Sequence, residues 1–189
     1  MIKLERPLIL ASGSPRRKEI LDTMGLPYIV DVSDADESYF AEPESMVLEL
    51  SRRKAQAVAD KHENAIILAA DTLVFCNEVL GKPKDAQHAK AMLHQLSGNW
   101  HSVFTGVTLI DTHTGKVLSK ADATRVHFVD LSPEDIDAYV ASREPLDKAG
   151  AYGIQGMGGM FIDKIEGSYS NVVGLPMALV RSMLKEIAG

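Results

Sequence analysis

Near its N-terminus the chain has a short apolar run that ends abruptly at a segment of serine, glycine and proline. This change of residue type limits the folds that the chain can adopt. Residues 7–11 are Pro-Leu-Ile-Leu-Ala, which is typical of a buried strand. Residues 12–15 follow at once, where the Ser14 hydroxyl can cap free helix amides and the next residue is a proline, which tolerates the first helical position. An apolar helix face at residues 20–24 then ends at Gly25. The sequence therefore predicts a buried strand that runs directly into a helix.

The alternation of strands and helices continues along the first half of the chain, and the middle has a different pattern. Two β-rich stretches, residues 100–110 and 117–129, flank the turn-prone residues 112–116 and predict a hairpin. Alternating early elements and an antiparallel middle predict an α/β fold with a mixed sheet. The remaining expected elements are strands at 27–32 and 65–70, helices from Pro43, from Asp85 to Leu96, from Ser132 to Ser142 and from Pro176, and a glycine-rich stretch at 150–159.

Length and charge limit the class of protein. The 189 residues show no repeat, linker or low-complexity run, which favours one domain over 1–189 that could have two lobes. The chain has 20 Lys and Arg against 26 Asp and Glu, a formal charge of −6. Proteins that neutralise a nucleic-acid backbone carry a basic excess, so binding of a nucleic-acid polymer is not expected. A small phosphorylated ligand remains compatible, because it needs only a local cationic pocket.

Cysteine and histidine usage excludes several kinds of site. The only cysteine, Cys76, rules out an intramolecular disulfide and a multi-cysteine zinc site, and it is more typical of a buried strand residue than of a nucleophile. Six scattered histidines without an H-E-x-x-H motif do not predict a histidine metal site, and Trp100 and His101 are expected to be structural. Neither a signal-peptide core nor an apolar run of membrane-spanning length is present, so a cytoplasmic protein without a membrane partner is expected.

The first candidate site is the segment from Ser12 to Arg17. A loop of serines and a glycine between a strand and a helix presents free backbone amides and the positive end of the helix dipole to an anion. Arg16 and Arg17 in the first turn repel that dipole and each other, which makes sense if a phosphate lies between them. The alternative is a solvated basic helix start. The spacing does not match a Walker loop.

The second candidate is Asp71-Thr72, which directly follows the apolar run 65–70. We expect a carboxylate at the carboxyl end of a strand, where open α/β sheets place their ligands. Such a group can hold a divalent cation or orient a water molecule. The alternative is a turn aspartate that makes local backbone bonds. Asp36-Glu37 adds acidic groups after the second strand, although a charged loop also explains them.

Two lysines and a glutamine complete the candidates. Lys54 follows two arginines on the long helix, and Lys82 lies between a glycine and a proline, which constrain its backbone; solvent exposure is the alternative for both. Gln155 lies in the glycine-rich segment 147–156, where small residues let a planar ligand approach the backbone. Its amide can read the edge of an uncharged base. The alternative for this segment is a flexible surface loop.

Taken together, these segments resemble the Maf family, whose members are often labelled septum formation proteins. Each match is short, but their order is kept from Leu8 nearly to the C-terminus. The matching segments are Leu10-Ala11-Ser12-Gly13-Ser14-Pro15-Arg16-Arg17, Arg53-Lys54-Ala55, Ala70-Asp71-Thr72, Gly81-Lys82-Pro83, Leu96-Ser97-Gly98, His101, the run from Asp147 to Gly156, and Val173-Gly174-Leu175-Pro176.

The resemblance implies a nucleoside triphosphate pyrophosphatase that needs a divalent metal, Mg²⁺ or Mn²⁺. It also implies an elongated two-lobed fold around a central cleft, similar to that of the inosine-triphosphate pyrophosphatases, and often a homodimer. The 7-methyl-GTP subgroup has tryptophan, glutamine and glutamate at three specificity positions. Arg16, Thr72 and Gln155 occupy those positions here, which is the pattern of the dTTP/UTP subgroup.

The family's roles can be carried over to this sequence residue by residue. Asp71 is then the proton acceptor and a metal ligand, and Glu37 is a second acidic group at the metal. Ser12, Arg17, Lys54 and Lys82 hold the triphosphate. The implied function extends to modified pyrimidine nucleotides, to sanitation of the nucleotide pool and to a role in septum formation or cell-division arrest. Two alternatives stay open: a nucleotide-binding regulator of cell division without catalysis, and the same reaction with another base.

Overall fold

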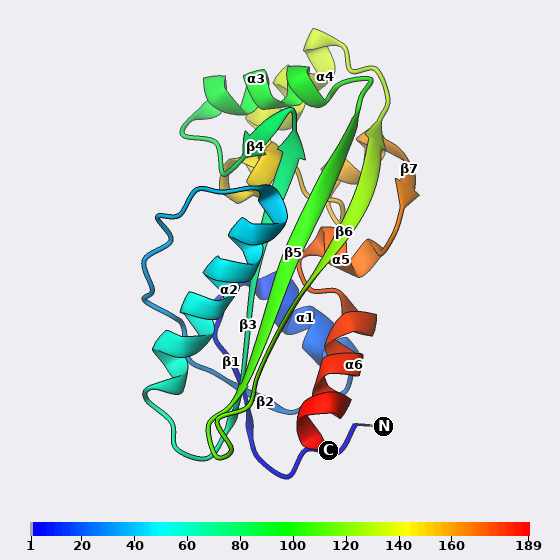
Figure 1. Cartoon of the computed structure of the whole chain (residues 1–189). Coiled ribbons are helices and arrows are strands. Elements are labelled where there is room, and N and C mark those ends of the chain that lie inside the picture. The colour runs from blue at the N-terminus through cyan, green and yellow to red at the C-terminus, as the bar shows by residue number, and fades with distance from the viewer. Residues whose placement is uncertain (1) are drawn as a thin grey trace. The chain divides into compact units, whose positions relative to one another are not determined.

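The computed structural model describes residues 2–189 and has a mixed seven-stranded sheet with helices, which confirms the α/β class (Figure 1). The strand order is β2-β1-β3-β5-β6-β7, and β4 pairs with β3. The strands are β1 (Leu8–Leu10), β2 (Tyr28–Val30), β3 (Ile66–Cys76), β4 (Glu78–Leu80), β5 (Trp100–Asp111), β6 (Val117–Phe128) and β7 (Ile162–Glu166). The α-helices are α1 (Pro15–Thr23), α2 (Pro43–Ala59), α3 (Ala86–Leu96), α4 (Pro133–Ala141), α5 (Tyr169–Val173) and α6 (Met177–Ala188). Three short 3₁₀ helices are η1 (Glu144–Asp147), η2 (Ala149–Ala151) and η3 (Met157–Phe161).

The chain forms two compact units. Unit 1 comprises the residues up to Asp71, Thr105–Asp122 and Gly174–Gly189. Unit 2 comprises Thr72–Phe104 and Ala123–Val173. Within the described residues 2–189, we find no helix that combines the length and the apolar character needed to cross a bilayer.

Unit 1 is built around the parallel strands β1, β2 and β3, with β1 in the centre. Leu10 of β1 pairs with Val30 of β2 and with Leu68 of β3. Side chains alternate between the two faces of a strand, and Ile9 and Ile67 lie on the same face. Helix α2 packs on this face. Helices α1 and α6 lie on the other side of these strands (Figure 1). The predicted strand-to-helix start of the chain is confirmed by β1 and α1.

Strand β3 corrects one expectation. The sequence predicts that the strand ends at Ala70, but it continues to Cys76, so Asp71 and Thr72 lie inside it. The strand continues because residues 73–76 are again apolar, and its second half pairs with β4 in an antiparallel ladder. A single charged residue does not end a strand when it finds a partner for its charge, as Asp71 does.

The predicted helix boundaries agree with the structure except for one cap. Gly25 follows α1 at φ +65°, and Asp85 caps α3 by accepting from the amide of His88 at 2.8 Å. Ser14 occupies the N-cap position of α1, but its side chain makes no capping hydrogen bond. The amide of Ser14 donates to the Ser12 hydroxyl at 3.2 Å, a local turn in which the Ser12 side chain bonds the backbone two residues on.

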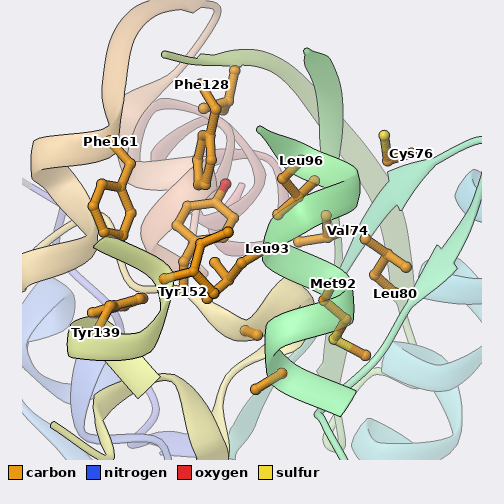
Figure 2. Packing of buried hydrophobic residues seen from close by; sticks show 14 of the residues in the cluster. Val74, Cys76, Leu80, Met92, Leu93, Leu96, Phe128, Tyr139, Tyr152 and Phe161 are labelled. Carbon is orange, nitrogen blue, oxygen red and sulfur yellow. The ribbon is translucent and has the colours of Figure 1, made fainter. Parts of the chain in front are cut away.

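Unit 2 has a core of aliphatic and aromatic side chains under α3. Figure 2 shows Leu93 and Leu96 of α3 beside Phe128 and Tyr152. Buried His101 contacts the Tyr152 hydroxyl at 2.6 Å, and burial lowers the pKa of His101 to about 4. His101 therefore has a structural place in the core, as expected.

Cys76 also lies in this core and is 6% exposed. Burial raises the pKa of its thiol, and the charge of Glu78 raises it further. A buried thiol with a raised pKa is a poor nucleophile, which supports the structural interpretation of Cys76.

Gly106 of β5 lies against the backbone of α2, and the stability of the fold depends on this close contact. A Cβ at Gly106 would lie 2.2 Å from the carbonyl oxygen of Val47. We expect Gly106→Ala to lower the free energy of unfolding by about 1–3 kcal/mol, because α2 must move away from the sheet. Gly81→Ala is the matched control, since a Cβ there meets nothing within 4 Å, and it should change stability by less than about 0.5 kcal/mol. Urea unfolding measures both, and equal effects would contradict this account of the packing.

Candidate active site

Asp71 and Lys54 form the centre of the candidate site in unit 1. Asp71 lies on the same face of β3 as Ile67 and Ala69, the face on which α2 packs, and it is 9% exposed. Lys54 of α2 reaches this face, and its Nζ donates to Asp71 Oδ1 at 2.7 Å. The packing of α2 on β3 thus places a cation directly against a buried carboxylate.

Glu37 joins this pair from the loop after β2. Its Oε2 lies 3.2 Å from Nζ of Lys54, and its side chain is 63% exposed. Lys54 therefore stands between two carboxylates, one buried and one largely in solvent. The predicted site residues Glu37, Lys54 and Asp71 are brought together, although they are distant in the sequence.

Arg53 holds the loop that carries Glu37, a role that the sequence analysis did not assign. Its guanidinium donates to the carbonyl oxygens of Ser38 at 3.3 Å and Asp36 at 3.5 Å. It also pairs with Glu49 one turn earlier at 2.8 Å. The signal available in the sequence is its place beside Lys54: neighbouring helix positions let one side chain hold the loop while the next holds the carboxylates.

Ser12 and Arg17 form a second part of the site in unit 1. The Ser12 hydroxyl accepts from Nη1 of Arg17 at 3.1 Å, and Nε of Arg17 donates to the carbonyl oxygen of Gly174 at 2.9 Å. Desolvation lowers the pKa of Arg17, while the negative charges of Asp71 and Glu37 act to raise it. Arg17 is thus within electrostatic reach of both carboxylates, which places the end of β1 and the Lys54 group in one charged region.

Arg16 precedes Arg17 in the first turn of α1 and is half-buried. Its positive charge lowers the pKa of Arg17 further, so the repulsion expected between the two arginines is present. An anion near this turn would relieve that repulsion, because it would be attracted to both guanidinium groups.

The carboxylates of the site suit a divalent cation that binds together with a substrate. Asp71 and Glu37 both contact the same ammonium group, so two hard oxygen ligands converge there. Across residues 2–189, no group of three or more His, Cys, Asp or Glu side chains could hold a metal ion. Mg²⁺ commonly uses one or two protein carboxylates and takes its other ligands from water and substrate phosphates, so the residues present fit such an ion.

Thr72, Lys82 and Gln155 are the predicted site residues of unit 2. Thr72 follows Asp71 in β3, so the two side chains point to opposite faces of the sheet. Lys82 and Gln155 are exposed, the former between β4 and α3 and the latter between η2 and η3. The loop of Lys82 is joined to the glycine-rich segment, because the amide of Gly150 donates to the carbonyl oxygen of Gly81 at 3.1 Å.

Comparison with known proteins identifies the family. The model of the family described as Maf-like protein matches residues 7–187. A Bacillus cytotoxicus protein named dTTP/UTP pyrophosphatase is 48% identical over 184 residues, which are 96% of this chain and 95% of that protein. Proteins of the same name from Bacillus mycoides and Bacillus anthracis are 47% identical over the same shares of both chains. The match covers both units and every segment named above, and the chain belongs to the Maf family.

Proposed function

We propose that this chain hydrolyses dTTP and UTP to the nucleoside monophosphate and pyrophosphate. The observation that carries the proposal is the group of Lys54, Asp71 and Glu37, in which a buried carboxylate and a cation are held together at 2.7 Å. The names of the similar Bacillus proteins support the same substrates and the same reaction.

The proposed reaction breaks the anhydride bond between the α- and β-phosphates. Water attacks the α-phosphorus, its proton passes to the Asp71 carboxylate, and pyrophosphate leaves. Such a reaction needs charge neutralisation and an aligned water more than it needs covalent chemistry. Asp71 suits the role of base because Lys54 and β3 fix its position.

Cationic and hydroxyl groups are proposed to hold the triphosphate. In unit 1 these groups are Ser12, Arg17 and Lys54. Lys82 is proposed for the same role from its place in the Gly81-Lys82-Pro83 motif. Lys54 exchanges part of its contact with the carboxylates for a phosphate oxygen when the nucleotide binds.

The divalent cation, Mg²⁺ or Mn²⁺, is proposed to bind at Asp71 and Glu37 together with the phosphates. When bound, it neutralises phosphate charge and makes a bound water more acidic. The two carboxylates at Lys54 would provide the oxygen ligands.

Arg16, Thr72 and Gln155 are proposed to select the base. Thymine and uracil present acceptor, donor and acceptor groups at O2, N3–H and O4. The carboxamide of Gln155 can accept from N3–H and donate to one of the two oxygens. Leaving such groups unpaired in a closed site costs about 1–3 kcal/mol each, which gives discrimination against other bases.

A nucleotide-binding regulator of cell division without catalysis is the second candidate, given the label that many family members carry. Binding alone does not require a buried carboxylate held beside a lysine, so the geometry favours the enzyme.

Product analysis across a nucleotide panel tests the proposed function. Wild-type protein with Mg²⁺ or Mn²⁺ should convert dTTP and UTP to monophosphate and pyrophosphate faster than CTP, ATP or GTP, and a chelator should stop the reaction. Phosphorus NMR of the products identifies the bond that breaks. Release of inorganic phosphate and a diphosphate would contradict the proposed bond, and binding without turnover would favour the regulator.

Gln155→Glu tests the base-selecting role. The substitution keeps the size of the side chain but replaces the amide donor by an acceptor, so we expect kcat/KM for dTTP and UTP to fall about tenfold or more, or about 1.4 kcal/mol. GTP, with donors at N1 and N2, should lose less. The exposed Gln87 of α3 provides the matched control Gln87→Glu, which should leave all rates unchanged. An unchanged ratio of dTTP to GTP turnover in Gln155→Glu would rule out base reading by this residue.

A further inference from the structure

Gln155 lies in a loop of residues 153–158. The C-terminal side of this loop is fixed by a carboxylate from outside the loop. Glu144 accepts from the amide of Met157 at 3.0 Å through Oε2 and from the amide of Gly158 at 3.2 Å through Oε1. Glu144 belongs to η1 and is separated from these amides by 13 and 14 residues. One side chain thus satisfies two backbone donors just after Gln155.

The N-terminal side of the same loop is fixed by Tyr139 of α4. Its hydroxyl accepts from the amide of Gly153 at 3.2 Å and donates to Glu144 Oε1 at 2.9 Å. The ring of Tyr139 is buried in the core of unit 2, with its centroid 5.0 Å from that of Phe161 (Figure 2). The hydrogen bonds of Glu144 and Tyr139 to the loop amides are together called the bracket below. Tyr139 connects this bracket to a rigid aromatic core.

The loop glycines allow this close approach. A Cβ at Gly156 would lie 2.4 Å from Oε1 of Glu144, and one at Gly158 would lie 2.6 Å from the hydroxyl of Tyr139. These positions cannot carry a larger side chain while the bracket is in place. Three glycines at 153, 156 and 158 also make the loop conformationally free in the absence of external contacts, so its shape depends on the bracket.

The ionisation states suit these hydrogen bonds. Burial acts to raise the pKa of Glu144, but the two loop amides, the Tyr139 hydroxyl and Lys148 favour the charged form and lower it below its ordinary value. Burial raises the pKa of Tyr139, so its hydroxyl keeps its proton and donates it to Glu144. An ionised carboxylate is an acceptor only, as its three donors require.

We infer that Glu144, braced by Tyr139, is the positioning residue that determines how the 153–158 loop presents Gln155 to the nucleotide base. Gln155 lies between the two fixed sides of the loop, two residues from Gly153 and two from Met157, so the bracket limits the directions open to its carboxamide. The inference rests on the proposed base-reading role of Gln155. Glu144 is proposed to touch neither base nor phosphate and to act through the loop.

Glu144→Gln tests the inference, because it keeps one carbonyl acceptor and turns the other oxygen into a donor that faces a donor. We expect the preference for dTTP over GTP, taken as the ratio of kcat/KM values, to fall about tenfold, mainly through a higher KM for dTTP. Hydrogen exchange at the amides of Met157 and Gly158 should become faster. Tyr139→Phe keeps the ring packing and removes only the hydroxyl, and it should reduce the preference in the same direction.

Glu166→Gln is the matched control, since Glu166 is exposed on β7 and pairs with Arg125 rather than with the loop. It should change neither the preference nor the exchange rates. If Glu144→Gln does not fold, Tyr139→Phe decides the question by the same two measurements.

The results of these variants distinguish the positioning role of Glu144 from the base-reading role of Gln155. An unchanged preference in folded Glu144→Gln, in a protein where Gln155→Glu does reduce it, overturns the positioning role alone. An unchanged preference in both variants overturns base reading by Gln155 and the inference with it. An equal loss of kcat on all nucleotides, without a change in preference or in amide exchange, assigns Glu144 a role outside base selection.

Discussion

The hydrogen bond between Lys54 and Asp71 is the interaction on which the candidate site of unit 1 depends. A buried carboxylate is costly unless it is paired, and Lys54 supplies both the charge and the donor. The pairing requires that α2 lie close to the sheet, which the missing side chain at Gly106 allows. It also requires that β3 continue through Asp71, since a turn at this position would not hold the carboxylate on the face covered by α2.

Other charged groups in unit 1 are arranged around this bond. Arg53, the neighbour of Lys54, fixes the backbone beside Glu37. The carboxylate of Glu37 is therefore held close to the ammonium group of Lys54. Arg17 is held by Ser12 at one end and by the Gly174 carbonyl at the other. The result is a set of preorganised charges. Catalysis of phosphoryl transfer depends mostly on such charges, because they stabilise the charge of the transition state.

The sequence predicted most of the features that depend on neighbouring residues, although the Ser14 side-chain cap is not made. The apolar run of β1, the stop at Gly25 and the cap at Asp85 are local signals, and each is confirmed. Elements that depend on distant partners were missed: β4 and β7 are short and have weak apolar patterns, so only their pairing with β3 and β6 defines them.

The same distinction applies to the candidate site. The type of residue and its place in a motif pointed to Lys54 and Asp71, and the structure joins them. The end of the strand at Ala70 was predicted wrongly, because a charged residue after an apolar run normally marks a strand end, and the sequence does not reveal its partner. Glu144 was missed for a related reason. It is an ordinary acidic residue in the sequence, and only folding brings it to the amides 13 and 14 residues later.

The rate of a single turnover of dTTP by Asp71→Asn tests whether the Asp71 carboxylate is the base of the reaction. The variant keeps the shape of the side chain and loses the basic carboxylate, so pyrophosphate release should fall about 100-fold or more. Urea unfolding must show a folded protein, and Asp163→Asn, at an exposed aspartate paired with His127 on β6, should retain the wild-type rate. Near wild-type release of pyrophosphate by folded Asp71→Asn would contradict the account.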